Sequence, residues 1–196
     1  MTENSLNINT EDTELINAFT NGNQNAFNII IRKYQKRVYW IIRKMVLDHD
    51  DADDITQEVF LKLYRSLNDF RGESKFFTYV YKIAINYSLN HIIKNKKIIT
   101  RKVNIEYADL KSHDKKADDQ IDSNQRTKIL EQAIASLPEQ QRAVFNMRYY
   151  DNLTYDEISD IMDKSIGGMK ANYFHAIKKL EKFLKGNKTF QSLEIN

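Results

Sequence analysis

The chain has no cysteine, one proline and only five glycines among its 196 residues. Without cysteine it can form neither a disulfide framework nor a thiolate metal site. Because glycine and proline supply most tight turns, their scarcity favours helices. No apolar run is long enough to cross a bilayer, and the opening segment MTENSLNINTEDTE is polar and acidic, unlike a signal or transit peptide. These absences predict a cytoplasmic, all-α protein that has no membrane partner.

Charge of one sign is not in large excess either. There are 30 lysines and arginines against 27 acidic residues, for a formal net charge of +3. A protein that coats DNA without sequence preference would be far more basic. The small excess allows nucleic-acid contact in local patches and leaves acidic surface for protein partners.

Apolar periodicity predicts a first helical domain over residues 10–97. It contains a short helix, a break at Asn21-Gly22-Asn23, a long helix, and a third helix with acidic residues in its first turn, where the helix dipole favours them. A fourth helix follows a loop around Arg71 and Gly72, with Ser74 as its predicted N-cap.

A second helical domain is predicted over residues 125–186, separated from the first by a charged, aperiodic segment (98–124) that is typical of a flexible linker. Two capping boxes are predicted here, Ser136 to Glu139 and Thr154 to Glu157. Gly186 is expected to end the last helix, and the polar tail (187–196) is expected to fray.

No pattern of catalytic, cofactor-binding or metal-binding residues is apparent. The densest carboxylate cluster, DHDDADD at residues 48–54, fails as a calcium-binding EF-hand loop because Ala52, Asp53 and Val59 stand where an oxygen ligand, a glycine and a glutamate are needed. The simpler interpretation is a charged helix N-terminus. We therefore predict that the protein is not an enzyme, and a metal-dependent nuclease on this cluster is a remote alternative.

The helix after Ser74 sorts into three stripes at about 100° per residue. Two are apolar and are predicted to pack against other helices: Phe76, Val80, Ile83 and Tyr87 form one, and Phe77, Tyr81 and Ile85 form the other. The third stripe combines cations, a ring and an amide: Lys75, Tyr79, Lys82 and Asn86. Such a set is typical of single-stranded nucleic-acid binding, and the acid-free basic run over residues 94–102 adds to it. An ordinary solvated helix face is the alternative.

Two blocks resemble the bacterial sigma-70 family, particularly its small extracytoplasmic-function (ECF) group. Residues 51–92, which contain DADDITQEVF and RGESKFFTYVYKIAINYSLNHI, resemble region 2, and residues 130–184, which contain LPEQQRAVFNMRYYDNLTYDEIS, resemble region 4. The order of the blocks, their separation and the total length agree with that group. The resemblance implies two small helical domains, a region 2 bundle and a region 4 helix-turn-helix, joined by a short linker without the long insert of housekeeping sigma factors.

The resemblance also implies roles for named residues. The D-x-x-Q-E segment, here Asp54, Gln57 and Glu58, is expected to bind the clamp helices of the β′ subunit of RNA polymerase. The set implied for opening the −10 promoter element and holding a flipped base is Arg71, Ser74, Lys75, Phe77, Tyr79, Lys82 and Asn86. Most family members have tryptophan where this chain has Tyr79, so promoter melting is expected to be weaker but present.

In region 4, the second helix of the helix-turn-helix is expected to read the −35 element in the major groove. The helix begins near Ser165 or Ile166, and its predicted buried stripe is Ile166, Met169, Tyr173, Ala176 and Leu180. The residues implied for DNA contact are Ser165, Gly168, Lys170, Ala171, Asn172, His175 and Lys178.

This helix departs from the family pattern. It has no arginine, the residue that most often reads guanine, and Phe174 lies on its outer arc. Ala171-Asn172 stands where serine-arginine is usual, and Asp163-Lys164 stands where the turn usually has glycine and a hydrophobic residue. Two interpretations remain open: the helix reads a divergent −35 sequence through methyl groups and DNA shape, or a separate DNA-targeting protein docks on region 4.

The sequence therefore predicts an ECF sigma factor that binds core RNA polymerase through the β′ clamp and the β flap, and binds promoter DNA. An anti-sigma factor is a further possible partner under this resemblance. The alternative is a stand-alone helix-turn-helix regulator that does not melt DNA.

Overall fold

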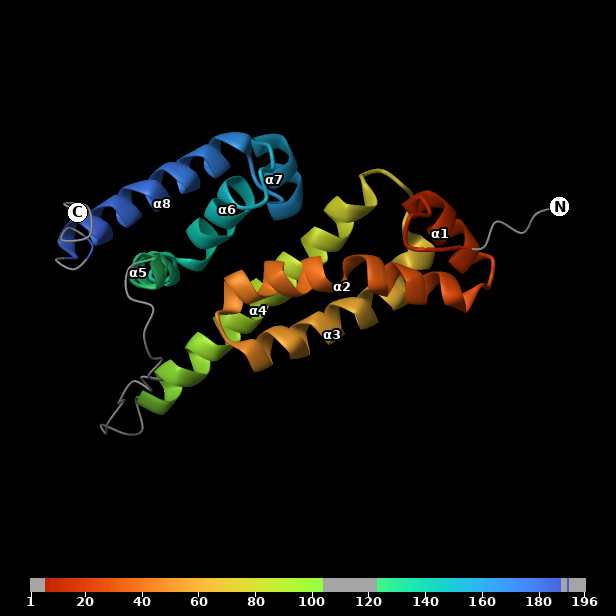
Figure 1. Ribbon diagram of the computed structural model, residues 1–196, viewed down its shortest axis with the longest axis horizontal. Helices are drawn as coiled ribbons and strands as arrows, with labels where there is room; N and C mark the ends of the chain where they lie inside the picture. Colours follow the sequence, from red (N-terminus) through yellow and green to blue (C-terminus); the bar gives the residue numbers. More distant parts are fainter. Residues whose placement is uncertain (1–5, 104–122, 188–189, 191–196) are drawn as a thin grey trace. The chain divides into compact units, whose positions relative to one another are not determined.

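The computed structural model describes residues 6–103, 123–187 and 190, and side chains in these ranges except those of residues 97–103 and 123–126. Every regular element within that part of the chain is a helix. The helices form two compact units, one built mainly from α1 to α4 and the other mainly from α5 to α8 (Figure 1). The predicted all-α architecture is confirmed. Among the described helices, none is both long enough and apolar enough to span a membrane.

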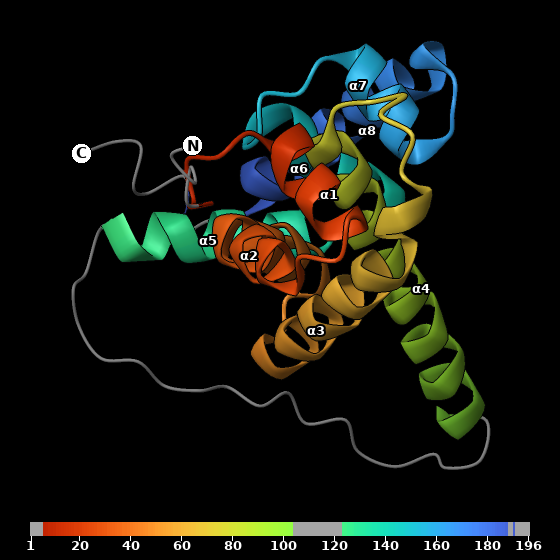
Figure 2. The same ribbon diagram turned by 90° about the vertical axis from the view of Figure 1, so that its right-hand side faces the viewer.

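The first unit is a helical bundle with a long central pair. Its elements are α1 (Asp12–Thr20), α2 (Gln24–Val46), α3 (His49–Ser66), the 3-10 turn η1 (Leu67–Asp69) and α4 (Phe76–Val103). α2 packs along α3, and α1 packs on α2 (Figure 2). The break between α1 and α2 is made by Gly22, whose φ of 95° is a conformation that glycine adopts most readily. The predicted break is therefore confirmed.

The core of this unit is formed by side chains that recur at helical spacing. Ile30, Ile42 and Met45 of α2 and Leu63 of α3 are completely buried. Burial of this kind contributes about 25 cal/mol for each Å² of apolar surface removed from water. α4 contributes both predicted apolar stripes, with Val80 and Tyr81 almost inaccessible.

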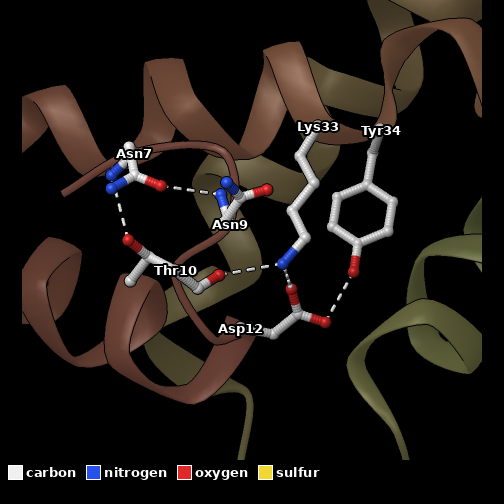
Figure 3. Close-up of polar contacts among 6 residues, drawn as sticks. All are labelled: Asn7, Asn9, Thr10, Asp12, Lys33 and Tyr34. Carbon is white, nitrogen blue, oxygen red and sulfur yellow. Dashed lines mark hydrogen bonds and ion pairs between the residues drawn. The ribbon is translucent and has the colours of Figure 1, made fainter.

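The N-terminal segment is fastened to α2 by a polar network (Figure 3). The Lys33 ammonium donates to the Thr10 carbonyl (2.9 Å) and pairs with the Asp12 carboxylate (2.8 Å), and the Tyr34 hydroxyl donates to the same carboxylate (2.5 Å). Burial, reinforced by Asp12, raises the pKa of Tyr34, so this hydroxyl keeps its proton over the physiological pH range. The network orients α1 and keeps Lys33 turned toward the N-terminal segment.

The second unit consists of α5 (Ser123–Ala135), α6 (Glu139–Tyr149), α7 (Tyr155–Met162) and α8 (Ile166–Gly186). α8 packs against both α5 and α6. The core cluster of this unit includes Ile134, Leu137, Phe145, Ala176 and Leu180, all buried. The long helix α8 is thus held on one side by the two helices that precede the helix-turn-helix.

Of the two predicted capping boxes, one caps a helix and the other does not. At α7 the capping box is confirmed, since the Glu157 amide donates to the Thr154 hydroxyl and the Thr154 amide donates to the Glu157 carboxylate. The Ser136 box is wrong: Ser136 donates to the Ala133 carbonyl at the end of α5, and α6 begins only at Glu139. Its hydroxyl is nearer the last turn of α5 and satisfies a carbonyl there.

Other boundaries also shift. Ser74 is not the N-cap of α4, because the helix begins at Phe76 and the Ser74 hydroxyl donates to the Lys75 carbonyl. α4 continues to Val103, into the segment predicted as linker, because that basic stretch contains no proline or glycine to stop it. α5 begins at Ser123, and α8 ends at Gly186 as predicted. Residues 104–122 of the predicted linker and almost all of the predicted tail lie outside the described residues.

Candidate nucleic-acid interface

The acidic cluster at residues 48–54 forms the start of α3. The Asp48 carboxylate accepts from the Asp51 amide at 3.0 Å, which makes Asp48 the N-cap. This hydrogen bond lowers the pKa of the Asp48 carboxyl. Asp50 and Asp51 occupy the first turn, where the helix dipole favours carboxylates. The predicted charged helix N-terminus is confirmed, and no arrangement suited to a metal ion occurs among the described side chains.

One turn further along α3, the three residues implied for polymerase binding share an exposed face. Asp54, Gln57 and Glu58 all point to solvent. Leu61, which follows Glu58 by three residues, lies on the same face with 58% of its surface exposed. The spacing of Leu61 from Asp54 and Glu58 places it on this face, although no motif in the sequence singles it out. A leucine exposed beside acceptor groups is the composition of an interface centre with a polar surround.

The aromatic-basic stripe of α4 is oriented as its spacing predicts. Lys75 and Asn86 are exposed, and Tyr79 and Lys82 are half-buried on the same side of the helix. The Tyr79 ring lies against the Phe70 ring (5.0 Å between centroids), and the Tyr79 hydroxyl donates to Ser66 at 2.8 Å. Tyr79 is therefore held in place rather than free to rotate.

A pocket of about 370 Å³ opens at the start of α4. Its walls combine rings, carboxylates, a guanidinium and a hydroxyl, supplied by Asp69, Phe70, Arg71, Glu73, Ser74 and Tyr79. Gly72 bends the loop with a φ of 74°, a conformation that side chains rarely adopt. The pocket thus brings together three of the residues implied for −10 recognition, namely Arg71, Ser74 and Tyr79, with Glu73 of the same loop and with Asp69 and Phe70, which precede the loop and carry no sequence motif.

Phe77 does not line this pocket. The Arg37 guanidinium covers the Phe77 ring at 3.6 Å from its centroid, and the Tyr34 and Tyr81 rings pack against it. Its predicted role in strand capture would require Arg37 to move. A cation–π contact of this kind joins α2 to the start of α4 and links residues 40 positions apart.

The second helix of the helix-turn-helix begins as expected. Ser165 is its N-cap and accepts from the Gly168 amide at 3.2 Å. Met169, Ala176 and Leu180 of the predicted buried stripe are buried, and Tyr173 is half-buried. Ile166 is 38% exposed and does not belong to that stripe, because it occupies the first position after the cap, before α8 reaches the core.

The outer side of α8 carries the residues implied for DNA contact. Ser165, Lys170, Ala171, His175 and Lys178 are exposed, and Gly168 and Asn172 are half-buried. Phe174 is 57% exposed, and the Lys178 ammonium lies over its ring and pairs with Glu181 at 3.3 Å. The face therefore has no arginine and places an aromatic ring beside a partly neutralised lysine, and its remaining donors are those of Ser165, Lys170, Asn172 and His175.

The unusual turn before α8 has a physical explanation. Asp163 has a φ of 51°, the left-handed conformation for which glycine is usual. Aspartate and asparagine visit this region more readily than other residues that carry a Cβ. The turn therefore keeps its shape although it lacks glycine.

The two glycines at the start of α8 should respond differently to replacement by alanine. A methyl group at Gly167 meets nothing within 4 Å, whereas at Gly168 it would lie 3.2 Å from the Ser165 hydroxyl oxygen. Gly167→Ala should raise the free energy of unfolding by up to about 1 kcal/mol. Gly168→Ala should show no gain, because disturbing an N-cap costs about 1 kcal/mol. Urea unfolding followed by circular dichroism would measure both.

A Ser165→Ala background provides the control for this pair. With the cap removed, both glycine replacements should stabilise the chain to the same extent. Equal effects in the wild-type background would show that the Ser165 cap does not distinguish the two positions.

Comparison with known proteins identifies the class. Residues 30–98 match the family described as Sigma-70 region 2, and residues 127–180 match the family described as Sigma-70, region 4. The chain belongs to the sigma-70 family, and its relatives place it in the ECF group. It is accordingly a transcription initiation factor, a class of protein that is not enzymatic.

Two curated relatives show how much of the chain is shared. The RNA polymerase sigma-H factor of Pseudomonas aeruginosa is 31% identical over 182 residues, covering 89% of this chain and 94% of the relative. The ECF RNA polymerase sigma-E factor of Escherichia coli strain K12 is 31% identical over 172 residues, covering 84% and 90%. The sigma factor RpoE of Bartonella quintana, solved in complex with the anti-sigma factor NepR, has the same fold, with a TM-score of 0.63 at 16% identity and coverage of 83% and 98%.

Proposed function

We propose that this sigma factor opens promoters by holding one unpaired base of the −10 element in the pocket at the start of α4. The observation that carries the proposal is the composition of that pocket. Its two rings, Phe70 and Tyr79, are already packed together, so they offer a preformed apolar wall for a base. Stacking on such a wall contributes about 1–3 kcal/mol per base.

The polar walls of the pocket suit a base edge. Asp69 and Glu73 can accept hydrogen bonds from an exocyclic amino group, as acidic side chains do from cytosine, and Arg71 can donate to a phosphate or a ring acceptor. Lys75 and Asn86 continue along the exposed stripe of α4, where the strand backbone would leave the pocket. Strand separation would then draw its free energy from base capture and polymerase docking rather than from nucleotide hydrolysis.

The exposed face of α3 is proposed as the polymerase-binding surface. Asp54, Gln57 and Glu58 provide acceptors for a basic partner, and Leu61 provides an apolar contact among them. Region 4 is proposed to contact the β flap and the −35 region through α8. Since the partner is core RNA polymerase, we propose that the protein acts in the cytoplasm and has no catalytic activity of its own.

Run-off transcription would test this function. Core polymerase from the source organism should give discrete transcripts from fragments of its genomic DNA only when this chain is added. Transcripts that share an upstream hexamer near −35 would show that α8 reads bases despite lacking arginine. Polymerase binding without discrete starts would instead indicate a separate DNA-targeting protein, for which exposed Phe174 offers a contact.

A further inference from the structure

The outer face of α2 is basic and carries an exposed tryptophan. The helix contains six lysines and arginines and no acidic residue in 23 positions. Four of its outward residues, Arg32, Lys36, Trp40 and Arg43, follow one another at spacings of four, four and three. At 100° per residue they fall within an arc of about 80° and span about 16 Å of helix. We call these four residues the α2 face.

The exposure of this face is not a consequence of poor packing. The opposite side of α2 is buried at Ile30, Val38 and Ile42, none of which has any accessible surface. Arg32 and Lys36 are exposed, Trp40 is 51% exposed, and Arg43 is half-buried. About half of the Trp40 surface is therefore accessible to a partner, on a helix whose other side is fully packed.

Neighbouring cations of α2 are used within the fold, which makes the α2 face distinct. Lys33 is turned toward Thr10 and Asp12 (Figure 3), and the Arg37 guanidinium lies on the Phe77 ring. Trp40 has an edge contact with the Tyr39 ring, with 5.3 Å between centroids, and Tyr39 is itself bonded to His49 at 2.8 Å. That contact steadies the indole and leaves about half of its surface accessible.

We infer that the α2 face binds single-stranded DNA, with the cations on the phosphates and a base stacked on Trp40. A row of cations with an intervening flat ring is what sequence-tolerant single-strand binders use. Tryptophan and arginine are also enriched at the centres of protein interfaces, so an acidic protein is the other occupant that the test has to exclude. The adjacent helix α3 is opposite in character, with five acidic residues in HDDADDITQE, so the two helices of this pair suit partners of different charge.

The inference rests on the proposed function only for the source of the strand, which would be the DNA that promoter opening exposes. It adds a site that the −10 pocket does not contain, since none of the four residues lines that pocket. Binding at the α2 face can therefore be measured without polymerase.

Trp40 is the only tryptophan of the chain, so its fluorescence reports on this face alone. The full-length chain would be titrated with a 20-nucleotide oligothymidine at several salt concentrations. Stacking should quench the Trp40 emission in a saturable way. The double variant Arg32→Gln, Lys36→Gln should bind the oligothymidine at least tenfold more weakly. It should also reduce the slope of log affinity against log salt concentration by about 1.4, since each phosphate contact on a single strand contributes about 0.7 to that slope.

The matched control is Lys62→Gln with Arg65→Gln on α3, two exposed residues whose loss changes the net charge equally. This control should bind the oligothymidine with the same affinity as the wild type. Trp40→Phe, followed with a labelled oligonucleotide, should retain most of the affinity because a ring remains.

Three outcomes would overturn the inference. One is a Trp40 emission that does not respond to DNA, and another is an equal loss in the α2 and α3 double variants, which would mean that only bulk charge matters. The third is quenching by polyglutamate as strong as that by DNA, which would assign the face to an acidic protein. A chain that directs transcription but gives any of these results would refute this site and leave the proposed function intact.

Discussion

Replacing Tyr79 with alanine should reduce run-off transcription by about 5- to 150-fold. The ring forms one wall of the −10 pocket, and losing a stacking contact of 1–3 kcal/mol corresponds to a factor of this size. The loss should appear in promoter opening, measured by permanganate reactivity of unpaired thymines. Binding of the same holoenzyme to duplex promoter DNA, measured by mobility shift, should change little.

Two conservative variants distinguish the ring from its hydroxyl. Tyr79→Phe removes only the hydrogen bond to Ser66 and should stay within about fivefold of the wild type, because such a bond contributes about 1 kcal/mol or less when partly exposed. Tyr79→Trp provides a larger stacking surface and should open promoters at least as well as the wild type. If phenylalanine were as damaging as alanine, the hydroxyl network rather than stacking would be the functional element.

Helical periodicity predicted most of the fold. The breaks, the acidic start of α3 and the buried stripes of α4 all follow from local spacing, which needs no knowledge of distant contacts. The two capping boxes show the limit of that approach. Thr154 and Ser136 stand in similar sequence patterns, yet only Thr154 caps a helix, because the helix that ends at Ala135 takes the Ser136 hydroxyl.

Only some residues of the candidate sites could be predicted from the sequence, because each site combines residues from separate helices and loops. Sequence pattern indicated Arg71, Ser74 and Tyr79, but the pocket also needs Asp69 and Phe70, which precede the loop and have no periodic signal. The cover over Phe77 comes from Arg37, in another helix, and no local rule predicts that contact.

Two residues that the sequence did not indicate, Leu61 and Trp40, differ from expectation in their exposure to solvent. Leu61 and Trp40 belong to apolar residue types, so a periodicity argument assigns them to the core unless the orientation of the helix is known. The structure shows each on an outward face, beside groups of one charge: acidic for Leu61 and basic for Trp40. That pairing of an apolar side chain with a charged surround is what identifies both faces as candidate interfaces.

Replacing Glu58 with lysine should weaken binding of core RNA polymerase by about 30-fold or more. Glu58 lies at the middle of the exposed α3 face, between Gln57 and Leu61, where a basic partner is proposed. Reversing the charge replaces an attraction by a repulsion, and unfavourable juxtapositions of this kind cost several kcal/mol at an interface. Competition between labelled wild-type chain and each variant for a limiting amount of core enzyme would give the ratio of dissociation constants.

Glu14→Lys is the matched control, because Glu14 is also exposed on a helix of the first unit and the replacement changes the net charge equally. It should compete almost as well as the wild type. Glu58→Gln, which removes the charge without reversing it, should fall between the two. Glu14→Lys and Glu58→Lys losing affinity equally would show that polymerase responds to overall charge, and the α3 face would then no longer be supported as the docking surface. A graded loss confined to position 58 would place the exposed α3 face at the polymerase interface, because only a local contact distinguishes Glu58 from Glu14.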